Sequence, residues 1–303
     1  MFAALSKYSF VQHRIEPRYS LAAQELLWKL FSYERCYREL ILQTRPGSEE
    51  RQRLMQELYA KETFRWYCHL DRLEGREVEE KLTDRTKDAA SLTALLKPGR
   101  CLEAGAGSGA LCRSLALRGW QVDGLDVVES PFWKEIEAET GGAAHFTVGS
   151  LASVSLPEGH YDLCLMDNVL EHFPPGDYEI ALLKALALLR PGGWLALVVP
   201  NPLTGPHDVS RYFVPPGQPA QGCHFNERRL WDLRRDLFRA GFRNFKTPAC
   251  GGLAFGRRFG WSEWYFGSAI FLEAVFRLVP AYYRDSILFQ ILVTCAVAGQ
   301  KPL

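Results

Sequence analysis

The 303-residue sequence predicts an α/β fold in which a mainly parallel sheet carries helices on both faces. Between residues 98 and 201, short apolar runs alternate with stretches whose apolar residues recur at helical spacing. This alternation is typical of strands joined by crossover helices. Residues 1–97 show helical spacing with many charged pairs and no strand pattern. These two sequence patterns together predict a helical segment followed by an α/β domain.

The composition is that of an ordinary globular protein. Hydrophobic residues make up 47% and charged residues 23%, and the net charge of +1 provides no global attraction to nucleic acid or anionic membranes. The eight cysteines form no C-x-x-C pair, which favours buried thiols over disulfides or zinc. The N-terminus lacks a secretory apolar core, and no stretch reaches 18 uninterrupted apolar residues. We therefore expect a cytoplasmic protein.

The first 97 residues are expected to form three helices. Apolar spacing predicts a helix over 21–42, which Pro46-Gly47-Ser48 ends. The acidic start after Ser48 predicts a second helix to about residue 73, and a third is expected over about 78–96. We interpret residues 1–97 as a helical cap on the α/β domain, residues 98–303.

The expected strands all lie in the α/β domain. They are predicted at 101–104, 121–126, 144–148, 161–167, 194–200, 242–247 and, as a last central strand, within 287–298. The helices between them are predicted at 108–118, 131–138, 178–190 and about 226–240. Asn226 is the expected N-cap of the last of these helices, and Gly241 its C-cap.

A glycine-rich turn follows the first of these strands. Gly105, Gly107 and Gly109 lie between that strand and a helix, where glycine permits a tight turn and lets backbone N–H groups approach a ligand. Asp126 ends the next strand, about 20 residues on, where a carboxylate can bind ribose hydroxyls. The arrangement predicts a site for a nucleotide-like cofactor.

Two classes of cofactor fit this turn. Gly105, Gly107 and Ala110 match the dinucleotide pattern G-x-G-x-x-G/A, so an NAD(P)-dependent oxidoreductase is one interpretation. Glu103, inside the strand, favours the other. An acid there would face the pyrophosphate of a dinucleotide, whereas a ligand with a cationic amino group and a sulfonium benefits from it.

At Glu103–Gly109 the sequence resembles class I S-adenosylmethionine-dependent methyltransferases, particularly those acting on small molecules and glycans, whose first strand ends in E/D-x-G-x-G-x-G. The resemblance covers about residues 90–250 and the last strand. Further matches follow in the family's order: Y-D-L-C-L-M-D-N-V-L-E-H-F at 161–173, R-P-G-G-W at 190–194 and the H-F-N-E segment at 224–227. The family's usual acid near the adenine is replaced by Ser150.

This resemblance implies a Rossmann-like, seven-stranded mixed sheet whose last strand is antiparallel, with helices on both faces and a helical N-terminal cap. It also implies S-adenosyl-L-methionine as cofactor. The residues expected to bind it are Glu103, Gly105, Ala106, Gly107, Gly109, Asp126, Val127, Ser150, Leu151, Asp167 and Asn168.

Methyl transfer requires the protein to align the acceptor and, for a hydroxyl, to remove a proton. His172 and His224 are the candidate bases, although His172 could instead orient its loop. Tyr59, Tyr67 and His207 are candidates for acceptor binding, although packing or loop polarity also explains them. No metal is expected, because the sequence contains no spaced ligand set.

The expected acceptor is a hydroxyl on a small molecule, sugar or lipid-linked glycan. Nucleic acid is not expected, because D-N-V-L stands at 167–170 where nucleic-acid adenine methylases carry [D/N]-P-P-[Y/F/W]. An aromatic-rich insertion at about 251–285 allows a lid, a homodimer face, contact with a membrane surface, or packing on the N-terminal helices. A non-catalytic interaction protein acting through this insertion remains an alternative.

Overall fold

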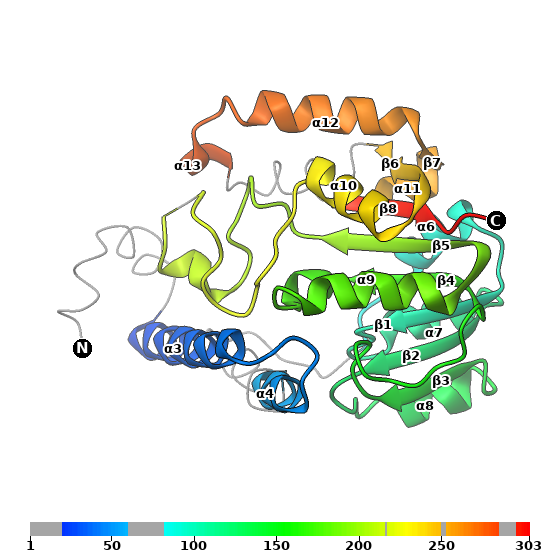
Figure 1. Ribbon diagram of the computed structural model, residues 1–303, viewed down its shortest axis with the longest axis horizontal. Coiled ribbons are helices and arrows are strands. Elements are labelled where there is room, and N and C mark those ends of the chain that lie inside the picture. Colours follow the sequence, from blue (N-terminus) through cyan, green and yellow to red (C-terminus); the bar gives the residue numbers. More distant parts are fainter. Residues whose placement is uncertain (1–19, 60–81, 216, 250–252, 285–294) are drawn as a thin grey trace.

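The computed structural model describes residues 20–59, 82–215, 217–249, 253–284 and 295–303. Its strands are β1 (Arg100–Ala104), β2 (Gln121–Asp126), β3 (Ala144–Val148), β4 (Tyr161–Asp167), β5 (Leu189–Val199), β6 (Arg243–Pro248), β7 (Trp261–Ser262) and β8 (Cys295–Gln300). They form one sheet in the order β3-β2-β1-β4-β5-β8-β6-β7 (Figure 1).

The sheet is mixed. Strands β1 to β5 pair in parallel, whereas β8 pairs antiparallel with both β5 and β6. The prediction of a Rossmann-like sheet with an antiparallel last strand is therefore confirmed. The sheet has eight strands and not the expected seven, because the two-residue β7 pairs with the end of β6.

Helices cover both faces of the sheet (Figure 1). They are α3 (Leu21–Gln43), α4 (Glu49–Tyr59), α6 (Thr86–Leu95), α7 (Ala110–Ala116), α8 (Trp133–Glu139), α9 (Asp177–Leu188), α10 (Leu230–Ala240), α11 (Leu253–Phe259), α12 (Trp264–Phe276) and α13 (Ala281–Arg284). Gly241 is the left-handed C-cap of α10, as expected. The expected N-cap at Asn226 is wrong, because α10 begins at Leu230 and the Asn226 amide instead donates to the Phe173 carbonyl.

Two apolar cores flank the sheet. One contains buried residues of α9 and α10, such as Leu182 and Leu233, and the other contains residues of α6 and α7, such as Leu92 and Leu115. Helix α6, although it lies within the predicted cap segment, thus packs against α7 and the sheet. The division of the chain near residue 97 stays a prediction.

Helices α3 and α4 have apolar clusters of their own. Phe31 of α3 stacks on Phe213 with ring centroids 4.7 Å apart, and Leu58 of α4 packs with Ile41 and Cys223. Figure 1 places both helices on the side to which the arrowheads of the parallel strands point. Among the described helices, none has the length and apolar character that crossing a membrane requires.

Candidate cofactor and acceptor site

A cavity of about 1000 Å³ opens at the carboxyl ends of β1, β2 and β4. The loops that follow these strands form much of its wall, and Gln52, Met55 and Tyr59 of α4 contribute from the opposite side. Open α/β sheets bind their ligands at this edge, because the loops there can differ without disturbing the sheet. The helical segment that precedes the sheet therefore completes the site.

The glycine turn lines part of the cavity. Gly105 and Gly107 have left-handed φ values of +78° and +53°. A Cβ at Gly105 would lie 2.2 Å from Val169 Cγ2, so a side chain has no room there. A Cβ at Gly107 would have no neighbour within 4 Å, so the backbone is open to a ligand.

Asp126 connects this turn to β2. Its carboxylate accepts hydrogen bonds from Gly107 N at 2.7 Å and Val128 N at 3.1 Å. Burial raises the pKa of Asp126 above its ordinary value, although these backbone donors lower it. A carboxylate oxygen can accept more than one hydrogen bond, so Asp126 keeps the capacity to bind a ligand hydroxyl.

Two predicted cofactor acids lie outside the wall of the cavity. Glu103 is 3% exposed and accepts a hydrogen bond from Cys112 Sγ at 2.9 Å, and burial raises its pKa to about 8. Asp167 forms an ion pair with Arg85, which precedes α6. Asn168 donates to Asp167 Oδ1 at 3.0 Å and lines the cavity itself.

Some of the remaining cofactor candidates line the cavity and others do not. Val127, Ser150 and Leu151 line the cavity. Ala106 and Gly109 do not; the Ala106 N–H donates to the Leu125 carbonyl and Gly109 is the N-cap of α7. Several other residues line the cavity but were not predicted, because their local sequence carries no signal for a site. They are Gln52, Thr83, Val128, Phe132 and Val169.

His172 and Tyr59 meet at the other side of the cavity and both line it. The Tyr59 hydroxyl lies 2.8 Å from His172 Nδ1 and 3.4 Å from the Cys223 carbonyl. With the proton on Nδ1, His172 donates to Tyr59 and Tyr59 donates to Cys223, so every group is satisfied; we assign this tautomer. It leaves a lone pair on Nε2. Burial, with the nearby His224, lowers the pKa of His172 to about 3.

His224 lies beside His172 but does not line the cavity. The two rings meet edge to face with centroids 4.6 Å apart, and His224 Nδ1 lies 2.9 Å from Glu227 Oε1. Burial alone would lower the pKa of His224, but the hydrogen bond to Glu227 and the charges of Glu171 and Asp208 raise it. His224 therefore carries positive charge more readily than an ordinary histidine.

His207 belongs to the same cluster. Its backbone N–H donates to Glu227 Oε1 at 2.8 Å and its Nδ1 lies 3.3 Å from Glu227 Oε2. Burial would raise the pKa of Glu227, but its hydrogen bonds with His207 and His224 lower it to about 2. His207 does not line the cavity, and Tyr67 lies outside the described residues.

Glu171 is a site feature that sequence reasoning missed. Its side chain is fully buried next to His172 in the chain, and its carboxylate has no hydrogen bond among the described residues. Burial raises its pKa to about 8, while the charge of His224 lowers it. The L-E-H tripeptide marks this position, but no local signal shows that the acid is enclosed.

Two groups of side chains come near metal-binding geometry among the described residues. One is His172, Cys223 and His224, and the other is Glu34, Asp208 and Cys223; the ligand atoms of each lie within 4.8 Å of one another. Burial holds the pKa of the shared Cys223 thiol well above its ordinary value, so the thiolate that a metal needs is disfavoured. The absence of a metal stays a prediction.

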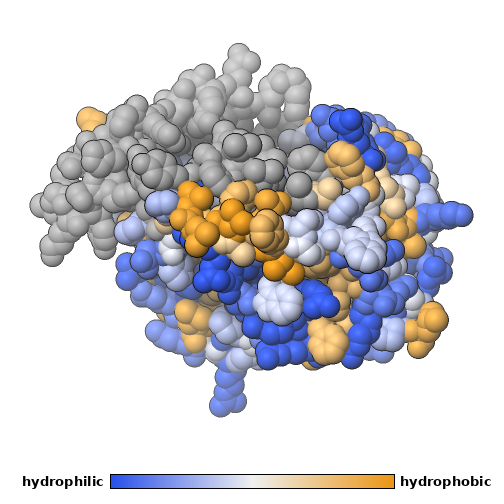
Figure 2. Space-filling model, turned by 90° about the horizontal axis from the view of Figure 1, so that it is seen from above, coloured by the Kyte–Doolittle hydropathy of each residue, from blue (hydrophilic) through white to orange (hydrophobic). Residues whose placement is uncertain are grey.

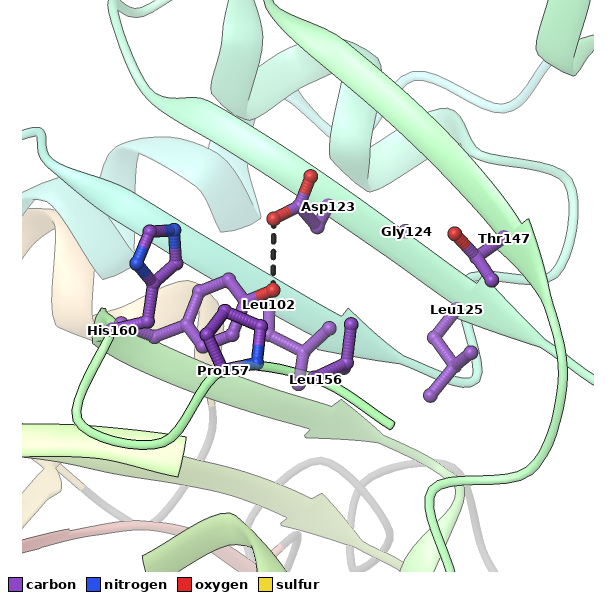
Figure 3. A pocket seen from close by; sticks show the side chains of 9 residues that line it. Leu102, Asp123, Gly124, Leu125, Thr147, Leu156, Pro157 and His160 are labelled. Atoms are coloured by element: carbon purple, nitrogen blue, oxygen red, sulfur yellow. Dashed lines mark hydrogen bonds between the residues drawn. The ribbon is translucent and has the colours of Figure 1, made fainter. Parts of the chain in front are cut away.

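A second cavity, of about 160 Å³, lies between β1, β2 and the loop before β4. The Tyr161 hydroxyl donates a hydrogen bond of 2.8 Å to Asp123 Oδ2. Figure 3 shows Asp123 in the wall of this cavity, with a hydrogen bond drawn to it. The wall of this second cavity contains none of the predicted site residues. We therefore place the functional site in the larger cavity.

Comparisons with known proteins point to methyltransferases. Among curated proteins, a malonyl-(acyl-carrier protein) O-methyltransferase of Serratia marcescens is 31% identical over 97 residues, which are 32% of this chain and 36% of that protein. A ubiquinone biosynthesis O-methyltransferase of Marinobacter nauticus is 33% identical over 99 residues, 31% of this chain and 41% of that protein. The chain thus matches less than half of the length of these relatives.

A solved structure shows the same fold. The Burkholderia thailandensis 1,6-didemethyltoxoflavin-N1-methyltransferase, with 1,6-didemethyltoxoflavin and S-adenosylhomocysteine bound, aligns with a TM-score of 0.50 and 20% identity over 79% of this chain and 88% of that chain. A family model described as a methyltransferase domain matches residues 75–247, which is more than half of the sequence. The chain therefore belongs to this methyltransferase-domain family.

Proposed function

We propose that this chain transfers the methyl group of S-adenosylmethionine to a hydroxyl of a small molecule, sugar or lipid-linked glycan. One observation carries the proposal: a single cavity has the Gly105–Gly107 turn and Asp126 on one side and the Tyr59–His172 pair on the other. Two O-methyltransferases among the matched relatives support the choice of a hydroxyl acceptor.

The cofactor side of the cavity suits S-adenosylmethionine, which supplies an electrophilic methyl group on a sulfonium. We assign the ribose hydroxyls to Asp126 and the adenine to the region of Ser150 and Leu151. The open backbone at Gly107 leaves room for close approach. We assign Glu103 to the amino group of the cofactor, although its side chain does not line the cavity. A cationic amino group nearby would favour the ionised form of this carboxyl.

We assign the acceptor side to His172, with Tyr59 as its positioning residue. The Tyr59 hydroxyl holds the ring so that Nε2 keeps its lone pair. A pKa of about 3 makes His172 a weak base, so it aligns the hydroxyl and takes its proton only as the carbon–oxygen bond forms. His224, beside it, supplies positive charge and not the base. His207 and Tyr67 stay candidates for acceptor contact.

Alanine variants test this assignment. We expect His172→Ala to lower kcat by roughly 10²–10⁴-fold, the usual contribution of a general base. Tyr59→Phe keeps the ring but removes the hydroxyl, so kcat should fall with little change in the KM for the cofactor. Because His172 is neutral above about pH 5, its contribution should not vary with pH through neutrality. If His172→Ala with His224→Ala leaves turnover at pH 7 unchanged, neither residue transfers the proton.

Calorimetry separates the proposed function from its two alternatives. S-adenosylmethionine and S-adenosylhomocysteine should bind with micromolar affinity and NADH should not. Binding of NADH alone would indicate an oxidoreductase. Failure of all three ligands would indicate a non-catalytic interaction protein.

A further inference from the structure

Helix α12 is apolar on its exposed face as well as on its buried face. The buried face is fixed to the domain, because Glu273 accepts hydrogen bonds from Asn201 Nδ2 at 2.6 Å and Leu230 N at 2.9 Å. The exposed residues recur three or four positions apart, and none of them is charged. The large ones are Trp264, Phe271 and Val275, whose exposed fractions are 89, 67 and 38%, and Leu278, two residues after the end of the helix, is 84% exposed.

Exposing such an apolar surface to water is unfavourable. Monomeric proteins rarely leave contiguous apolar patches exposed, and those they keep mark interaction sites. Figure 2 looks onto the side of the molecule that carries α12 and shows apolar residues gathered there among polar ones. A surface helix usually places its charged residues outward, whereas α12 places apolar residues outward and buries Glu273.

The surroundings of this helix are positively charged. Residues 228–284 contain eleven Lys and Arg but only four Asp and Glu, although the whole chain has a net charge of +1. Arg257 and Arg258 are exposed at the end of α11, and Arg277 is exposed directly after α12. Of the four acids in 228–284, Glu273 is buried, and Asp232 and Asp236 form ion pairs with arginines. The fourth, Glu263, is exposed directly before α12. Three exposed cations, Arg257, Arg258 and Arg277, thus flank α12 in the chain, against one exposed acid.

We infer that the α12 face, defined by Trp264, Phe271, Val275 and Leu278 with the bordering arginines, docks on an anionic lipid surface. The apolar side chains would enter the boundary between headgroups and acyl chains, and the guanidinium groups would bind phosphates. A second copy of the chain fits less well, because a twofold contact would bring two arginine-rich borders together. Nucleic acid would match the charge but leave the apolar residues in water.

This surface goes beyond the proposed methyl transfer and is separable from it. No residue of α12 lines the large cavity. Variants on the α12 face should therefore change lipid binding while the affinity for S-adenosylhomocysteine stays the same.

Co-sedimentation of the full-length protein with vesicles tests the inference. We expect binding to vesicles of equimolar phosphatidylglycerol and phosphatidylcholine at low salt, and much weaker binding to pure phosphatidylcholine or at high salt. Phe271→Asp should lower binding roughly tenfold or more, because one aromatic side chain would no longer leave water. Arg257→Glu with Arg258→Glu should also lower it. Leu183→Asp is the matched control, because Leu183 is 55% exposed on α9.

Three results would overturn the inference. The first is no binding to anionic vesicles at low salt. The second is an equal loss of binding in Leu183→Asp and Phe271→Asp. The third is a dimer in sedimentation velocity that Phe271→Asp converts to a monomer in the absence of lipid, which would assign the face to a second copy. Circular dichroism and S-adenosylhomocysteine affinity confirm that each variant is folded.

Discussion

Gly105 and Gly107 share a left-handed backbone but differ in their surroundings. At Gly105 a methyl group would meet Val169, whereas at Gly107 it would meet only the cavity. We therefore expect Gly105→Ala to lower both stability and cofactor affinity. Gly107→Ala should cost only about 1–2 kcal/mol of stability, the usual penalty of a left-handed alanine, yet weaken S-adenosylhomocysteine binding about tenfold or more.

Thermal unfolding and calorimetry on the two variants measure this difference. Asp126→Asn provides a third comparison, because it keeps the shape of the side chain and removes the charge. The account of the turn would be wrong if Gly107→Ala bound S-adenosylhomocysteine as tightly as the original chain.

At the scale of residues, the sequence pattern predicts groups that line the cavity better than it predicts their partners. Gly105, Gly107 and Asp126 could be assigned because strand, turn and spacing are local features. The enclosure of Glu171 and the ion pair between Arg85 and Asp167 could not, because they join segments far apart in the chain. Only folding brings such groups together.

At the scale of elements, the Arg85–Asp167 pair fastens the start of α6 to the end of β4. The Asp167 side chain is 6% exposed, so removing its partner leaves an almost buried carboxylate without its counter-charge. We expect Arg85→Ala to lower the free energy of unfolding by about 1–3 kcal/mol. Adding Asp167→Asn should restore part of this loss, because a neutral amide is less costly to bury.

Chemical denaturation of the single and double variants measures this coupling. Arg113→Ala is the control, because the Arg113–Glu139 pair is open to solvent and should contribute much less to stability. Equal effects of Arg85→Ala and Arg113→Ala would contradict the assigned role.

The elements themselves follow the sequence where a repeating pattern is long enough. The strand over 161–167 and the helix near 178–190 are found close to their expected positions. Strand β7 was missed because two residues carry no periodicity. Helix α10 begins four residues later than expected, because Asn226 serves a tertiary contact with Phe173 and not the helix end.

At the scale of the whole molecule, buried acids link stability to pH. Burial raises the pKa of Glu34 to about 7 and those of Glu103 and Glu171 to about 8. In the unfolded chain these groups titrate near 4.5, so between these values the folded chain binds more protons. Their contribution is complete below about pH 4.5 and is lost as the pH rises through 7 to 8.

We therefore expect the unfolding temperature to fall between pH 6 and pH 8.5, by an amount equivalent to a few kcal/mol in the free energy of unfolding. Glu171→Gln should flatten this decline, because its amide does not titrate. Scanning calorimetry across the pH range provides the test. A stability that stays level over this window would show that these acids are already ionised in the folded state.

The central claim is that one cavity holds the cofactor on the Asp126 side and the acceptor on the His172 side. The most direct measurement is a crystal structure of the full-length protein with S-adenosylhomocysteine. We predict that the ribose hydroxyls bind the Asp126 carboxylate, that the adenine lies at Ser150 and Leu151, and that the sulfur faces the His172 side of the cavity. Ligand bound elsewhere, or a ribose that does not contact Asp126, would contradict the claim.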